Sequence, residues 1–127
     1  MSRQSRGEGA HVWLVPDCYL PEKSSGSLHS HEAICVLNTS RQEANLRLSL
    51  YFEDRDPVVD IPVTVSGERT RHVRLDRAEE IGGVEVPRGV PYAVRLESDV
   101  PVAVQCSRLD TSQEALALMT VVAHAAG

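Results

Sequence analysis

The sequence predicts an all-β protein: a single antiparallel β-sandwich domain, jelly-roll-like, built from about eight short strands. Several segments alternate apolar and polar residues, most clearly where Leu46, Leu48, Leu50 and Phe52 are separated by polar neighbours, which is the period of a half-buried strand. Such segments recur between Gly and Pro turns and do not alternate with helices, as in sandwiches and barrels. A chain of 127 residues is the size of one domain.

The first strands follow from local signals. Residues 1–10 are polar and contain glycine, so we expect a disordered tail there and an ordered domain over residues 11–127. HVWLV at 11–15 predicts a short strand that ends at Pro16. Residues 28–38 predict a second strand, with Glu32, Ile34 and Val36 on one side and His31 on the other. Its C-terminal half is apolar on both sides, so we expect it to be buried on both faces.

The central strands are bounded by charged or proline-containing turns. Residues 44–53 form the clearest strand, and the charged stretch 53–57 predicts a turn. Residues 58–66 resume the alternation, and Pro62 favours an edge position because proline donates no hydrogen bond to a neighbouring strand. Residues 70–75 predict a further strand.

The last third of the chain is rich in turns. Gly82, Gly83 and residues 87–91 predict turns, followed by two short strands at 92–96 and 102–106. Residues 111–123 fit two interpretations, because TSQE at 111–114 is a capping-box pattern while the residues after it alternate as in a strand. We expect one helical turn and then a final strand.

Composition limits the class of protein and its partners. The apolar share of 42% and the charged share of 24% are ordinary for a globular protein and exclude a transmembrane span, collagen and a coiled coil. A net charge of −5 disfavours nucleic acid as the main partner. Three cysteines without a CxxC pair, and an N-terminus without an apolar signal segment, favour a reducing, cytoplasmic setting.

The histidines raise the question of a metal site. His29 and His31 leave the same face of the predicted strand, and Glu32 and His72 are further candidate ligands. VPRGVPY at 86–92 resembles the second cupin motif, but Tyr92 stands at its metal-ligand position and no Glu follows His31 at the spacing of the first motif. We therefore expect surface imidazoles and no metal or other cofactor, and a cupin-like metal enzyme remains the alternative.

Enzyme chemistry finds little support elsewhere in the sequence. There is no Gly-x-Ser-x-Gly elbow, no phosphate loop and no cysteine with a basic neighbour in sequence, so we do not expect an enzyme. Four arginines lie between residues 69 and 77, but strand geometry divides them between two faces. They favour a solvated strand, with an acidic or hydroxylated ligand or DNA as alternatives. Arg108 and Asp110 fit either a site or a pair that holds a turn.

Stretches spread over nearly the whole chain resemble the soluble sensory rhodopsin transducer family. The resemblance lies in Trp13, YLP at 19–21, SHEAICVLN at 30–38, LYFED at 50–54 with Pro57, RTRHVR at 69–74, DVPVAVQ at 99–105 and SRLD at 107–110. Their order along the chain makes the resemblance far more specific than any one stretch does.

This resemblance implies a small β-sandwich that assembles as a homotetramer and serves as the cytoplasmic partner of a membrane photoreceptor, a rhodopsin, without inserting into the membrane. It also implies a non-catalytic signalling or adaptor module with a small-molecule, sugar-like or anionic ligand. The candidate ligand-binding residues carried over from the matching stretches are His31, Glu32, Asn38, Arg69, His72, Arg74, Gln105, Arg108 and Asp110, together with Trp13.

Overall fold

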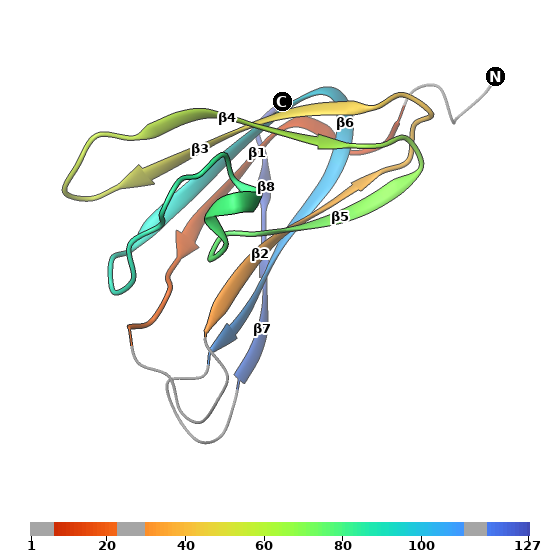
Figure 1. Ribbon diagram of the computed structural model, residues 1–127. Helices are drawn as coiled ribbons and strands as arrows, with labels where there is room; N and C mark the ends of the chain where they lie inside the picture. The colour runs from red at the N-terminus through yellow and green to blue at the C-terminus, as the bar shows by residue number, and fades with distance from the viewer. Residues whose placement is uncertain (1–6, 23–29, 111–116) are drawn as a thin grey trace.

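Eight antiparallel strands and one short 3-10 helix make up the computed structural model, which describes residues 7–22, 30–110 and 117–127 (Figure 1). The elements are β1 (Ala10–Cys18), β2 (His31–Asn38), β3 (Ala44–Phe52), β4 (Val58–Val65), β5 (Arg69–Arg74), η2 (Ala78–Glu80), β6 (Tyr92–Asp110), β7 (Ala117–Val122) and β8 (His124–Ala125). The all-β, antiparallel, single-domain prediction is confirmed. Among the described residues, no helix is long and apolar enough to cross a membrane.

Strand β6 joins the two halves of the sheet. Its first part pairs with β1 and β3, which gives the order β4-β3-β6-β1-β8. Its second part pairs with β2 and β7, and β2 pairs in turn with β5. The two halves are therefore parts of one continuous sheet, and Figure 1 shows β6 running through both of them.

The prediction of two strands at 92–96 and 102–106 was wrong, because β6 continues without a break over 19 residues. Its ladder with β3 ends at Ser98, Val102 pairs with Ala10 of β1, and the ladder with β2 begins at Ala103. Pro101 lies in the stretch where β6 changes partners, so its missing N–H costs little there. The strand predicted to end at Pro16 likewise continues to Cys18, with a register shift between Val15 and Cys18 that accommodates the proline.

The edge strand and the final strand were predicted correctly, whereas the short strand β8 was not predicted. Pro62 lies in β4, which is an edge strand as expected. The predicted helical turn at 111–114 lies outside the described residues, whereas a final strand is found at Ala117–Val122. The two-residue strand β8 had no sequence signal; it pairs with Trp13 and Leu14.

The inner faces of both halves share one hydrophobic core. It includes Ile34 and Val36 from β2, Leu48 from β3, Val73 from β5 and Cys106 from β6. The expectation that β2 is buried on both faces was wrong, because Leu37 on the outer face is 45% exposed. No described element of the chain covers that face.

Candidate functional site

Strand β2 carries the polar residues that the sequence singled out, and alternation divides them between its two faces. Glu32 and Asn38 point inward and are fully buried, whereas His31 and Cys35 lie on the outer face and are half-buried. A strand exposes successive side chains on opposite faces, so His31 and Glu32 do not belong to one site.

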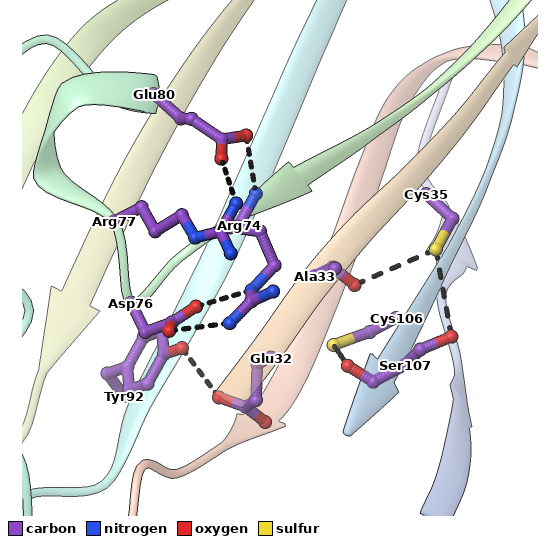
Figure 2. A network of polar contacts seen from close by, with 10 residues as sticks. All are labelled: Glu32, Ala33, Cys35, Arg74, Asp76, Arg77, Glu80, Tyr92, Cys106 and Ser107. Carbon is purple, nitrogen blue, oxygen red and sulfur yellow. Dashed lines mark hydrogen bonds and ion pairs between the residues drawn. The ribbon is translucent and has the colours of Figure 1, made fainter. Parts of the chain in front are cut away.

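The Glu32 carboxylate is the centre of a buried hydrogen-bond network. Its Oε1 accepts hydrogen bonds from the Tyr92 hydroxyl at 2.5 Å and from the Tyr19 backbone N–H at 3.0 Å. Its Oε2 accepts one from Nε of Arg108 at 2.7 Å. Arg108 Nη2 also donates to the Asp17 carbonyl at 2.9 Å. Figure 2 shows the Tyr92 hydroxyl directed at the Glu32 carboxylate, and the network ties the end of β1 to both ends of β6.

Burial is the largest influence on the pKa values of Glu32 and Tyr92. Burial raises the pKa of Glu32 above its ordinary value, while the hydrogen bonds of Tyr92 and Arg108 act in the opposite direction. Burial likewise raises the pKa of the Tyr92 hydroxyl far above its ordinary value, and the nearby Glu32 charge adds to that shift. Tyr92 therefore remains a neutral donor throughout the physiological pH range.

Two buried thiols complete the surroundings of Glu32. Ligand-type atoms of Cys18, Glu32 and Cys106 lie within 4.8 Å of one another, the spacing of a metal site. The contact with Cys106 and the burial of Cys18 raise the pKa of the Cys18 thiol, so it is a neutral thiol in the metal-free protein. Both oxygens of Glu32 are already engaged. The cluster fits a hydrogen-bonded part of the core better than a metal site.

Several predicted site residues have structural roles. Asn38 Nδ2 donates to the Gln42 carbonyl at 2.7 Å, and Asn38 Oδ1 accepts from the Ser40 hydroxyl at 2.7 Å. Trp13 packs against the core, and its Nε1 donates to the Val102 carbonyl at 2.8 Å. These contacts hold a loop and the β1–β6 pair in place.

Arg69 stands apart from the other predicted residues, and Asp110 is described by its backbone alone. Arg69 is exposed, belongs to the inward-facing parity of β5, and donates to the neighbouring Glu68 carbonyl. The backbone of Asp110 ends β6, and its side chain is outside the described part of the structure. Arg69 therefore does not join the others.

The outer face of β5, β2 and β6 brings together the remaining predicted residues. His72 of β5 and Gln105 of β6 are the cross-strand neighbours of Cys35 on its two sides. Arg74 and Ser107 flank Ala33 in the same way. Cys35 Sγ lies 3.6 Å from the Ser107 hydroxyl, and Figure 2 shows the two side chains meeting across neighbouring strands.

Two adjoining hollows follow this outer face, and both are lined by Cys35 and His72. One has a volume of about 290 Å³ and also contacts Leu37, Thr70, Ala103 and Gln105. The other, of about 320 Å³, also contacts His31, Arg74, Ser107 and Leu118. Imidazole, guanidinium, amide and hydroxyl groups therefore line one continuous face, the chemistry that recognises hydroxylated or anionic small molecules.

Arg74 is held in position beside these hollows by acidic neighbours. Its Nε and Nη2 donate to the two carboxylate oxygens of Asp76 at 2.7 and 2.8 Å (Figure 2). Burial by itself raises the pKa of Asp76, and the hydrogen bonds and charge of Arg74 outweigh it, so that this pKa lies below its ordinary value. Arg74 thus keeps a fixed orientation at the rim.

The structure also shows residues that sequence reasoning missed. The sequence indicated Tyr92 only as a residue at the metal-ligand position of a motif. It gave no signal that Glu32 has Cys18, Cys106 and Asp17 as neighbours. The cupin-like ligand set is not assembled, because Tyr92 meets Glu32 inside the core while His31 and His72 lie on the outer face; His29 is outside the described residues. The pairing of Arg108 with Glu32 across β2 and β6 required knowledge of the register.

Comparison with known proteins agrees with this architecture. No curated protein matches the chain. The structure of Thermotoga maritima 1070 superposes with a TM-score of 0.83 at 38% identity, covering 94% of this chain and 97% of the other. The Anabaena sensory rhodopsin transducer superposes with a TM-score of 0.72 at 31% identity, covering 84% of this chain and 94% of the other. The family model of the Anabaena sensory rhodopsin transducer matches residues 8–125, and the chain belongs to this family.

Proposed function

We propose that this protein is a non-catalytic cytoplasmic adaptor that binds a small polar ligand, sugar-like or anionic, on the outer face of β5, β2 and β6. The observation that carries the proposal is the pair of hollows that share Cys35 and His72. His31, Arg74 and Gln105 supply further donors and acceptors around them. Glu32, Asn38 and Trp13 support the scaffold beneath the site, and the Arg108 side chain links the two.

The experiment is a thermal-shift screen of sugars and small organic acids, because a ligand that binds the folded state raises the melting temperature. We expect one compound class to stabilise the protein, and we expect His72→Ala and Gln105→Ala to abolish that effect. Thr64→Ala, on the exposed face of β4, is the matched control and should respond as the wild type does. A screen in which every compound leaves the melting temperature unchanged rejects the proposal.

Assembly as a homotetramer is the second part of the proposal. Leu118 and Val122 on β7 are 75% and 72% exposed, and large apolar side chains exposed on the same face of an edge strand are typical of a covered interface. We expect light scattering after size exclusion to give the tetramer mass and Leu118→Glu to reduce it, with Thr64→Glu as control. A wild-type monomer rejects this part.

A membrane photoreceptor is the proposed protein partner, and the family supports it: the related Anabaena protein is a sensory rhodopsin transducer. The test is capture of a sensory rhodopsin, from detergent extracts of membranes of the source organism, on immobilised protein. Retention of the rhodopsin is the expected result. Its passage through the column unbound, at low ionic strength and in light and dark, counts against the partner.

A further inference from the structure

A third hollow, at one end of the sandwich, shares no lining residue with the two on the outer face. It has a volume of about 370 Å³, within the range of about 300–1,000 Å³ usual for small-molecule sites. Four segments surround it: Leu20 beyond β1, Arg55 in the β3–β4 turn, residues 75–78 after β5, and residues 84–88 before β6. Loops at the end of a sandwich are common positions for binding sites.

Hydrogen bonds hold the walls of this end hollow in place. The Gly89 N–H donates to the Leu20 carbonyl at 2.7 Å, and Arg88 Nη1 donates to the Pro21 carbonyl at 3.1 Å. On the other side, the Leu75 N–H donates to the Glu32 carbonyl at 2.9 Å. The hollow is thus formed before any ligand arrives, which lowers the entropic cost of binding.

The charges around the end hollow are of both signs. Arg55 is paired with Asp54 and Asp76 with Arg74. Within residues 7–22, 30–110 and 117–127, neither Glu85 nor Arg88 takes part in an ion pair. One anion and one cation therefore remain on the same rim without a charged partner in the described structure.

The floor beneath these two charges is apolar. Leu20 and Leu75 are almost fully buried, Val86 is nearly so, and Val84 is half-buried against the core. A ligand that suits the hollow carries a positive and a negative group close together and an apolar part that covers this floor. A sugar lacks the charges, and a simple carboxylate leaves Glu85 next to a second anion.

We propose that the end hollow binds a free α-amino acid with an apolar side chain. Its carboxylate pairs with Arg88, its ammonium group pairs with Glu85, and its side chain covers Leu20, Leu75 and Val86. Guanidinium groups suit carboxylates because they donate two parallel hydrogen bonds. Exposed ion pairs are weak one by one, so selectivity for the zwitterion arises from both pairs forming together over the apolar floor. This site is separate from the outer-face site of the proposed function.

Titration of the full chain with L-leucine, followed by isothermal calorimetry and by amide chemical shifts, tests this proposal. We expect saturable binding, with shifts concentrated at residues 84–89. Two analogues each lack one charge: 4-methylpentanoate has no ammonium group and 3-methylbutylamine has no carboxylate. We expect each to bind at least about tenfold more weakly, since each leaves one charged rim residue unpaired. Absence of leucine binding at millimolar concentration, or equal binding of either analogue, overturns the proposal.

Variants locate the site. Glu85 is exposed and makes no hydrogen bond within the described structure, so Glu85→Gln should fold normally and lose about tenfold in leucine affinity. Arg88→Gln should lose as much, and Arg88→Lys should recover part of the affinity because it keeps the charge. Arg47→Gln, on the exposed face of β3, is the matched control. Unchanged affinity in Glu85→Gln rejects the site.

The same variants separate this site from the outer-face site. His72→Ala should abolish the response to the outer-face ligand and leave leucine binding intact, and Glu85→Gln should do the reverse. Failure of the sugar and organic-acid screen with leucine binding retained rejects the proposed function alone. A successful screen without leucine binding rejects the end hollow alone.

Discussion

The two faces of β2 place similar chemistry in opposite environments. On the inner face, Glu32 is fully buried and each of its carboxylate oxygens accepts hydrogen bonds. On the outer face, one residue away, His31 borders an open hollow. Buried charge is tolerated only when neighbouring groups satisfy it, whereas polar groups at a hollow border space that a ligand can enter. The comparison shows that a polar residue in a matching motif can serve the scaffold as readily as the site.

The largest effect that tests this contrast is the loss of the buried ion pair. Arg108→Ala leaves the Glu32 carboxylate buried without its cation, which should lower the free energy of unfolding by about 3–5 kcal/mol. The matched control is Arg47→Ala, whose pair with Glu97 is largely exposed and should contribute about 0–1 kcal/mol. Urea unfolding followed by circular dichroism measures both. Equal losses in the two variants would remove the distinction between the faces.

A pair of apolar truncations on the same strand gives the next effect. Ile34→Ala opens a cavity in the core and should cost about 2–5 kcal/mol. Leu37→Ala removes a side chain that is 45% exposed on the outer face and should cost less than about 1 kcal/mol in the monomer. Chemical denaturation at several protein concentrations measures the two. A loss for Leu37→Ala that grows with protein concentration would show that assembly covers this residue.

The carboxylates of Glu32 and Asp76 should respond to pH with opposite signs. The pKa of Glu32 is raised above its ordinary value of 4.5, so the stability of the wild type relative to Glu32→Gln is greatest below pH 4.5. It should fall as the pH rises through the folded-state pKa, by about 1.4 kcal/mol for each pH unit between the two pKa values.

The pKa of Asp76 is lowered below its ordinary value of 3.8. The stability of the wild type relative to Asp76→Asn is therefore fully present above pH 3.8 and should be lost as the pH falls through the folded-state pKa. This change should be the smaller of the two, because solvent screens the Arg74–Asp76 pair more than the core. Unfolding curves from pH 2 to 8 check both, and slopes of the same sign would contradict the assignment.

The smallest effect on stability is expected at the proposed ligand site itself. His72 is exposed on β5, so His72→Ala should change the free energy of unfolding by no more than about 0.5 kcal/mol while abolishing stabilisation by the outer-face ligand. Melting curves with and without that ligand measure both quantities. A large loss of stability without ligand would assign His72 to the scaffold instead of the site.

Predictions from the sequence succeeded where a signal is local. The alternation over residues 44–53 placed β3 nearly to its ends, and Pro62 correctly indicated an edge strand. The predictions failed at Pro16, which was interpreted as a strand end, and between residues 96 and 102, where a break was expected and Pro101 lies inside β6. A proline ends a strand only where a neighbouring strand needs its N–H, and that need depends on pairing between distant segments.

At the site, too, local patterns predicted which residues share a face of a strand, but they did not predict which residues of distant strands meet. Alternation separated His31 from Glu32, and it also placed Arg71 and His72 on opposite faces of β5. The hydrogen bonds from Tyr92 and Arg108 to Glu32 span 60 and 76 residues. No local pattern encodes contacts of that kind.

The sequence by itself determined the all-β class, the two faces of β2, β3 and β5, and the family, because strand alternation and ordered motifs are properties of neighbouring residues. Only the tertiary structure decided which polar residues form hydrogen bonds inside the fold and which border a hollow. That outcome depends on the register of β2 against β5 and β6 and on the loops that enclose the end of the sandwich. Register and enclosure arise from contacts between segments far apart in the chain, where burial and hydrogen bonding are settled for the molecule as a whole.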